Sequence, residues 1–297
     1  MRALLHVLPL ATAALLIRGQ AGEDGLVPPE VEIQTGEFTA ARAAFHTKLV
    51  RVGPAPAKAT APSPPTDVTV VEFRSGELPL RAWLQRPDAD DSVRSPAVVF
   101  LHGGFAFGLE DWQMTLPMRE AGYVVLAPML RGENGQAGSY SLFYDEVDDV
   151  LAAGRFLAAQ PFVDAHHVYV AGHSVGGTLA LLAAMASKEF RAAASFSGSP
   201  DQVIYCRLGI PPEQIPFDAS DPRELQLRSP LAYARSFKCP VRMFFGSEEP
   251  HFRLSTERTA ELARAAHLDV AAVQVEGDHF SALPAAMEQC LVFFEEH

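Results

Sequence analysis

Residues 168–177 read VYVAGHSVGG, and residues 178–184 continue as TLALLAA. The first four residues form the short apolar run of a buried strand, and the last seven favour a helix. A serine between glycines at such a strand-to-helix turn is typical of a G-x-S-x-G nucleophile elbow, in which a strained backbone projects the serine above the sheet. The alternative is a glycine-rich helix start that Ser174 merely caps. The strand before it and the helix after it favour the elbow.

The helix predicted after Ser174 begins where negative charge is favoured. The first backbone N–H groups of a helix have no partner inside it, and the helix dipole is positive at that end. Such a donor stabilises the charge that develops on a carbonyl oxygen under nucleophilic attack. We therefore expect the N–H of Val175 to be one of two donors in an oxyanion hole.

The other donor is expected at a second glycine-containing turn. Residues 98–101 are the apolar run VVFL, and they end in His102-Gly103-Gly104-Phe105. In hydrolases with a nucleophile elbow, a glycine pair at the end of an early strand supplies the second oxyanion donor. We assign it to Gly104 or Phe105, with a plain tight turn as the alternative. His102 is expected to brace the loop through a backbone hydrogen bond.

A serine nucleophile needs a general base. Residues 273–280 read VQVEGDHF, so His279 comes just past the last predicted strand, at the same sheet edge as Ser174. We assign His279 as the base, with His251 as its rival. His173 adjoins the nucleophile, but a neighbour on a tight turn is expected to point elsewhere.

The acid that orients the base should follow the preceding strand. Residues 241–245 are followed by GSEEP at residues 246–250, and a carboxylate there could reach the loop of the base. Glu249 is the assignment and Glu248 the runner-up, while a solvated pair of carboxylates is the alternative. Asp278 adjoins the base but is interpreted as a residue that fixes its own loop.

The rest of the chain alternates short apolar runs with stretches of helical spacing. Residues 68–73 and 78–84 flank a Ser-Gly-Glu turn and predict an antiparallel hairpin. The later runs suit parallel strands buried on both faces. They are residues 97–101, 123–127, 168–171, 193–196, 241–245 and 270–275. Helical spacing is found in residues 146–159, 175–188, 256–267 and 284–294. Eight strands with interleaved helices predict an α/β fold.

Two segments depart from this alternation. Residues 199–237 contain six prolines and are interpreted as a small lid inserted between two late strands. Residues 22–65 are an N-terminal extension, with one helix predicted over residues 38–50 and a stiff proline-rich linker after it. The main domain is expected to span residues 66–297.

Residues 1–21 are interpreted as a signal peptide. The Ala/Leu-rich run of residues 3–17 is too short to cross a hydrocarbon core of ~30 Å as a helix. Small residues at Gly19 and Ala21 suit cleavage after Ala21. We expect export to the periplasm or the extracellular space, with no membrane span in the mature chain. The alternative is a frayed apolar N-terminus.

Composition narrows the class of function. The 297 residues include 24 Lys and Arg against 36 Asp and Glu, and the net charge of −12 disfavours nucleic acid as a partner. The three Cys and ten His show no metal-ligand spacing, so neither a metal nor another cofactor is expected. At most one disulfide could form, and the sequence does not indicate the oligomeric state.

The candidate residues together resemble an α/β-hydrolase over residues 66–297. The resemblance rests on the chain order Ser174, Glu249, His279, on the elbow and on the loop that starts at His102. It implies a mostly parallel eight-stranded sheet with helices on both faces and a small lid.

Other motifs resemble the catalytic domain of the prolyl oligopeptidase family, and dienelactone hydrolase-like enzymes share most of them. They are the Trp112 helix, residues 121–126, Arg131-Gly132 and residues 162–164. The chain departs from the family in three ways: Glu249 stands where Asp is usual, the large propeller domain of the family's large peptidases is absent, and no Glu pair is placed to bind a peptide N-terminus.

The expected activity is that of a serine hydrolase acting through an acyl-enzyme on small carboxylic esters or thioesters. A prolyl oligopeptidase-like peptidase or acylaminoacyl hydrolase acting on short peptides is the alternative, and a non-catalytic exported binding module is the second. Arg131 could bind a substrate carboxylate or tie its own loop. Phe217 and other apolar lid residues could shape an acyl pocket or close a core.

Overall fold

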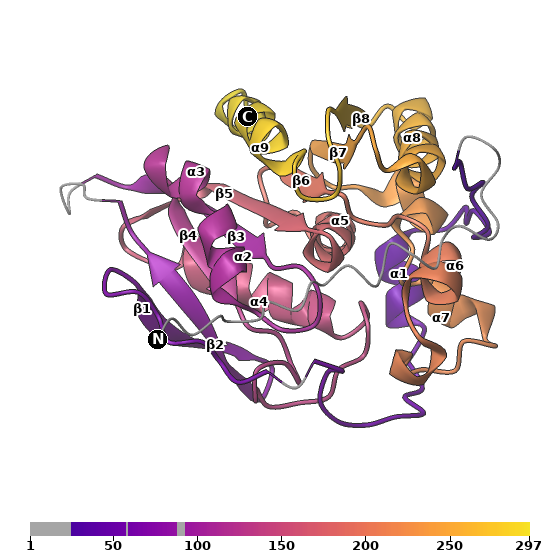
Figure 1. Cartoon of the computed structure of the whole chain (residues 1–297), viewed down its shortest axis with the longest axis horizontal. Helices are drawn as coiled ribbons and strands as arrows, with labels where there is room; N and C mark the ends of the chain where they lie inside the picture. The colour runs from indigo at the N-terminus through magenta and orange to yellow at the C-terminus, as the bar shows by residue number, and fades with distance from the viewer. Residues whose placement is uncertain (1–24, 58, 88–92) are drawn as a thin grey trace, which may run out of the picture.

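The computed structural model describes residues 25–57, 59–87 and 93–297 (Figure 1). The predicted signal peptide, residues 1–21, lies outside the described residues. Among the described residues, the central feature is one eight-stranded sheet with helices on both faces.

The sheet has the strand order β1-β2-β4-β3-β5-β6-β7-β8. The strands are β1 (Thr69–Ser75), β2 (Leu78–Gln85), β3 (Ser95–Leu101), β4 (Val124–Pro128), β5 (Val163–His173), β6 (Ala193–Phe196), β7 (Val241–Gly246) and β8 (Val270–Val275). β2 pairs antiparallel with β1 and β4, and the strands from β4 to β8 are parallel. This confirms the predicted mostly parallel sheet and its opening hairpin.

Two apolar layers cover the sheet. The main helices are α1 (Phe38–Ala43), α2 (Leu109–Met114), α3 (Leu116–Glu120), α4 (Glu146–Ala158), α5 (Val175–Ala186), α8 (Pro250–Ala265) and α9 (Leu283–Glu295). One layer includes residues of α1, α4, α5 and α8, and the other includes residues of α2, α3 and α9. β3 contributes residues to both layers because side chains alternate along a strand. Val99 and Leu101 lie on one face, and Val98 and Phe100 lie on the other. Such strands are apolar throughout, as predicted.

The first helix is shorter than the sequence predicts. It was expected over residues 38–50, but it ends at Ala43. The following chain turns to other partners: Lys48 N–H and Thr47 Oγ1 donate to Glu224, and Leu49 forms a β-bridge with Phe217. These tertiary contacts outweigh the weak local preference for helix.

Residues 199–237 form a layer of short helical pieces between β6 and β7. The pieces are α6 (Gln202–Ile204), the π-helix η2 (Tyr205–Gly209), the 3₁₀-helices η3 (Pro212–Gln214) and η4 (Pro230–Ser236), and α7 (Pro222–Gln226). We call this layer the lid. Ile210, Ile215 and Phe217 are buried in the core layer that includes α5, so they close a core.

Residues 25–57, which we call the N-terminal strap, run along the lid (Figure 1). The backbone N–H groups of Glu30 and Val31 donate to Asp201, and that of Phe38 donates to Ser236. The Phe38 side chain is fully buried. The strap therefore shares a core with the main domain.

The three cysteines, Cys206, Cys239 and Cys290, are free thiols. Within the described ranges, no helix is both long enough and apolar enough to span a lipid bilayer.

Candidate active site

Ser174 occupies a strained turn between β5 and α5. Its φ is 56° and its ψ is −117°, a backbone conformation that non-glycine residues rarely adopt. Its N–H donates to the carbonyl of Phe196 at 2.8 Å, which ties the turn to the end of β6. A Cβ atom at Gly172 would lie 2.4 Å from the backbone of Gly176, so this position requires glycine. The elbow predicted from the sequence is present.

The loop that starts at His102 lies against the elbow of Ser174. A Cβ atom built on Gly103 would lie 3.5 Å from the Cβ of Ser174, which places this loop against the elbow. The N–H groups of Gly104, Phe105 and Val175 have no hydrogen-bond partner among the described residues. The backbone donors that the sequence assigns to the oxyanion hole are therefore unengaged, as that role requires.

His279 and Glu249 are brought together at the ends of β8 and β7. His279 Nδ1 donates to Glu249 Oε1 at 2.6 Å. The other carboxylate oxygen of Glu249 accepts from Ser197 Oγ at 2.6 Å and from the Gly246 N–H at 2.8 Å. Glu248 is solvent-exposed. The geometry therefore favours Glu249 over Glu248 as the partner of the base.

Glu249 is ionised despite being only 2% exposed. Burial by itself would raise the pKa of its carboxyl, but the hydrogen bond and the charge of His279, with the bonds from Ser197 and Gly246, hold that pKa below its ordinary value. A carboxylate that accepts from Nδ1–H leaves Nε2 of His279 as the basic nitrogen.

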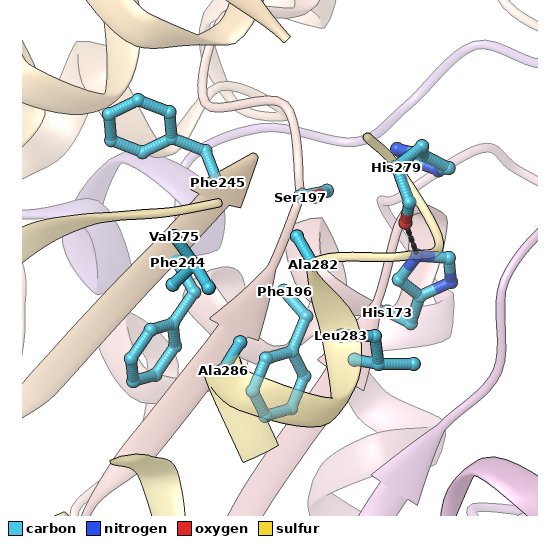
Figure 2. Close-up of a pocket in the computed structure, with 10 residues that line it drawn as sticks. All are labelled: His173, Phe196, Ser197, Phe244, Phe245, Val275, His279, Ala282, Leu283 and Ala286. Atoms are coloured by element: carbon cyan, nitrogen blue, oxygen red, sulfur yellow. Dashed lines mark hydrogen bonds between the residues drawn. The ribbon is translucent and has the colours of Figure 1, made fainter. Parts of the chain in front are cut away.

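His173 connects the elbow to the loop of His279. Its Nε2 donates to the backbone carbonyl of His279 at 2.8 Å, a bond drawn in Figure 2. The centroids of the two imidazole rings are 4.6 Å apart. Burial, and secondarily the charge of His279, lower the pKa of His173 to about 4, so its imidazole is neutral near pH 7. The turn therefore directs this side chain toward the loop of His279, and its Nε2 bonds a backbone carbonyl there.

A small apolar cavity lies beneath His279 (Figure 2). Phe196, Phe244 and Leu283 line it from β6, β7 and α9, and His173 and Ser197 contribute polar atoms. The imidazole of His279 is 30% exposed. The base therefore has an apolar floor and an edge that is open to solvent.

The sequence analysis did not identify two residues that support this site. Ser197 holds the second oxygen of Glu249, and His173 holds the loop of the base. Ser197 directly follows β6 at the same edge as Ser174, a position that could have drawn attention to it. The role of His173 depends on a contact between residues that are 106 positions apart, which no local pattern encodes.

The remaining predicted residues have other surroundings. Arg131 Nε and Nη2 bond both oxygens of Asp149, which corresponds to the alternative that Arg131 ties its loop. Phe217 is buried under the guanidinium of Arg228 at 3.8 Å, so the expectation that it shapes an acyl pocket is corrected. The side chain of His251 makes no hydrogen bond with any described residue, and Asp278 binds the backbone of its own loop, as predicted.

Nothing in the described part of the chain gathers three or more His, Cys, Asp or Glu side chains in an arrangement suited to a metal ion. The Ser174 hydroxyl makes no hydrogen bond with a described residue. In enzymes without substrate, catalytic hydrogen bonds are often long and tighten only in the complex.

Known proteins are similar to this chain in sequence and fold. The chain is 23% identical over 204 residues to the uncharacterized peptidase YtmA of Bacillus subtilis, covering 63% of this chain and 76% of YtmA. A puromycin-hydrolyzing peptidase of Mycobacterium tuberculosis superposes with a TM-score of 0.69 at 22% identity, over 77% of this chain and 40% of that chain. Esterase 2 of Thermogutta terrifontis superposes with a TM-score of 0.61 at 21% identity, over 78% of this chain and 95% of that chain. These likenesses confirm the α/β-hydrolase fold.

The family is shown by the sequence itself. The model of the prolyl oligopeptidase family matches residues 110–273, more than half of the chain, and this segment includes the elbow and Glu249. With the elbow, the strand order and this match in agreement, the chain is a serine hydrolase that belongs to the prolyl oligopeptidase family.

Proposed function

We propose that this hydrolase cleaves small carboxylic esters or thioesters through an acyl-enzyme intermediate. The carrying observation is the hydrogen bond from His279 to the buried Glu249 at the sheet edge that also presents Ser174 and free backbone donors. This combination supplies a nucleophile, a base with one basic nitrogen, and a site for an oxyanion.

In the first half-reaction, Ser174 Oγ attacks the acyl carbon while Nε2 of His279 takes the hydroxyl proton. The carbonyl oxygen becomes negative and accepts from the N–H of Val175 and from that of Gly104 or Phe105. The tetrahedral intermediate then collapses. The bond to the leaving group breaks, and the imidazolium of His279 returns the proton to the departing alkoxide or thiolate.

In the second half-reaction, water attacks the acyl-Ser174 ester. His279 accepts a proton from that water, and the same backbone donors hold the oxyanion. Collapse releases the carboxylic acid and restores the Ser174 hydroxyl. Glu249 remains ionised throughout and stabilises the imidazolium that forms in each half-reaction, which is consistent with its lowered pKa.

The preference for esters is supported by a likeness. The chain aligns with nearly the whole length, 95%, of esterase 2 of Thermogutta terrifontis. A peptidase activity is the second candidate, because YtmA is described as a peptidase and the Mycobacterium tuberculosis structure as a puromycin-hydrolyzing peptidase. Both activities use the same groups and differ in the leaving group that His279 protonates.

The test compares kcat/KM for acetyl, butyryl and octanoyl p-nitrophenyl esters with a matched set of aminoacyl anilides. Fluorophosphonate labelling of the same preparations reports on Ser174, and Ser174→Ala is the control for both. We expect labelling and faster cleavage of the short esters. One methylene changes specificity by only ~1 to 3 kcal/mol in an apolar pocket, so the acyl series should vary gradually. Faster cleavage of the anilides than of every ester would establish the peptidase instead.

The sequence of residues 1–21 supports a second proposal, that the chain is exported and cleaved after Ala21. Expression of the full chain, recovery of the secreted fraction and N-terminal sequencing test it. A mature protein that begins at Gly22 is expected. Retention of Met1 in all fractions would refute export.

A further inference from the structure

His102 is buried at the start of the predicted oxyanion loop, and both of its ring nitrogens are engaged. Only 3% of the residue is exposed. Nδ1 lies 3.0 Å from the carbonyl oxygen of Gly103, and Nε2 lies 2.8 Å from Oε2 of Glu133. The pair with Glu133 is also almost completely buried, with side-chain exposures of 2% and 3%.

The partners of His102 determine where its protons are. A carbonyl oxygen can only accept, so Nδ1 must carry a proton to bond Gly103. Oε2 of Glu133 also accepts from the N–H of Leu130 at 3.3 Å. An ionised Glu133 requires a proton on Nε2 as well. A histidine that donates from both nitrogens is an imidazolium, and the ion pair as a whole is neutral.

The bond to Gly103 sets the direction of the next N–H group. The Gly103 carbonyl and the Gly104 N–H belong to one planar trans peptide, in which they point in opposite directions. Holding the carbonyl toward the buried ring of His102 turns the Gly104 N–H to the opposite side. Gly104 continues the loop with φ of 63°, and its N–H is without a partner among the described residues.

The loop is also held from the other side of Gly103. Its N–H donates to Asp111 Oδ1 at 3.2 Å, and Asp111 Oδ2 accepts from the N–H of Gly108 at 2.8 Å. Asp111 lies on α2, whereas Glu133 lies in the loop between β4 and α4. Two separate elements therefore fix the backbone of a single glycine next to Ser174.

We propose that the buried pair of His102 and Glu133 is a positioning device that holds the peptide between Gly103 and Gly104 in the orientation that presents the Gly104 N–H to the oxyanion. This inference rests on the proposed function and makes Gly104, rather than Phe105, the second donor. His102 acts through the peptide and does not touch the substrate.

The charge of His102 agrees with this arrangement. Burial would lower its pKa, but the charge and hydrogen bond of Glu133 outweigh burial and, with smaller contributions from Asp111 and the Gly103 carbonyl, raise the pKa to about 9. The loop should therefore keep both bonds at neutral pH. Above about pH 9, the imidazolium loses a proton and one of the two bonds must break.

The test uses two double variants in which the amide group at position 102 lies at different distances from the backbone. In His102→Asn/Glu133→Gln, the Asn side chain reaches the position of Nδ1 and can still donate to Gly103. In His102→Gln/Glu133→Gln, the Gln side chain reaches the position of Nε2 and leaves the Gly103 carbonyl free. Both remove the buried charge. His167→Gln removes a histidine of an exposed ion pair with Asp164 and is the control.

We measure kcat and KM for p-nitrophenyl acetate, with melting temperatures to establish folding. His102→Gln/Glu133→Gln should lose about 100-fold in kcat with little change in KM, since an oxyanion donor acts on the transition state. His102→Asn/Glu133→Gln should lose less than about 10-fold, and His167→Gln should match the wild type. Equal kcat losses in folded double variants would show a merely structural role and overturn the proposal.

A second measurement reports on the proton directly. In a long-range ¹H–¹⁵N spectrum at pH 7.5, both nitrogens of His102 should be protonated in the wild type and only one in Glu133→Gln, whose activity should also decline at lower pH than that of the wild type. A neutral His102 in the wild type would overturn the inference. If the wild type fails to turn over esters or to label at Ser174, the proposed function falls first, while the spectrum still tests the ion pair.

Discussion

Two buried histidines flank Ser174, and the molecule uses them in opposite charge states. His102 lies at the end of β3 with 3% exposure, and His173 lies at the end of β5 with 2% exposure. The ring of His102 has a carboxylate within hydrogen-bond distance, whereas His173 donates to the carbonyl of His279. Burial is equal, so the partner determines the charge.

The different charge states of the two histidines suit the proposed reaction. His279 gains a proton in each half of the proposed reaction, and a positive charge on the neighbouring ring of His173, 4.6 Å away, would oppose that gain. A pKa of about 4 keeps His173 neutral. His102 lies on the oxyanion side, where Glu133 neutralises its charge and its two ring nitrogens hold the loop by hydrogen bonds. Each side of Ser174 therefore has the charge state that suits its task.

The largest expected effect comes from removing the group that both histidines flank. Ser174→Ala should lower kcat by about 10⁶-fold and abolish fluorophosphonate labelling, because the hydroxyl performs the chemistry. Stability should hold or increase slightly. Unchanged esterase activity in the folded variant would show that neither histidine serves a nucleophile at this position.

On the His173 side, the next largest effect is expected from the acid that orients His279. Glu249→Gln should lower kcat by about 10⁴-fold, because an amide cannot stabilise the imidazolium and can impose the wrong tautomer. Glu248→Gln is the matched control and should be nearly silent, since Glu248 is exposed. Steady-state kinetics on one ester decide between them, and the reverse ranking would transfer the role to Glu248.

A smaller effect should come from His173 itself. His173→Leu leaves the His279 carbonyl without its donor and should lower kcat by about 10-fold to 100-fold, since a lost buried hydrogen bond costs ~1 to 3 kcal/mol. His173→Gln can place a donor where Nε2 lies and should recover most of that loss. The same kcat in both variants would show that the hydrogen bond from His173 to the His279 carbonyl does not contribute to catalysis.

The smallest effect is a difference in how stability depends on pH. The pKa of His173 is lower in the folded state than the ordinary 6.5, so its contribution falls as pH decreases from 6.5 toward 4. The pKa of His102 is higher in the folded state, so its contribution is complete below 6.5 and declines as pH rises toward about 9. Between them, the two histidines favour maximal stability near pH 6.5.

Melting temperatures between pH 4 and 9.5 test this pair of slopes. In Glu133→Gln, the fall in melting temperature toward alkaline pH should be smaller than in the wild type by several degrees. In His173→Gln, the fall toward acid pH should be smaller by a similar amount. Parallel curves for the wild type and both variants would mean that neither histidine has the charge state described above.

The sequence was most informative where chemistry and local backbone coincide. The elbow around Ser174 needs glycines because a Cβ atom at those positions would clash with the neighbouring backbone. The strands from β3 to β8 need apolar runs. Both requirements can therefore be recognised in the sequence. Parallel strands end at one edge, which brought His279 and Glu249 together in the prediction. The fold and these side chains were therefore accessible from the sequence.

What the sequence did not reveal depends on contacts between distant residues. The partner of His102 is Glu133, 31 positions away, and the partner of His173 is the carbonyl of His279. Similarly, Phe217 was expected to shape a substrate pocket, but it packs under Arg228 and pairs with Leu49 of the strap. Apolar residues in a lid give the same sequence pattern whether they face a ligand or pack in a core.

The N-terminal strap has a consequence for how the chain reaches its native state. Its anchors join Val31 to Asp201 and Phe38 to Ser236, across 170 and 198 positions of sequence. During synthesis, the strap is made well before Asp201 and Ser236, so Phe38 must stay exposed while the intervening part of the domain is synthesised. Docking of the strap should therefore be a late event in folding, and a chain stalled before residue 236 would present an apolar segment to chaperones.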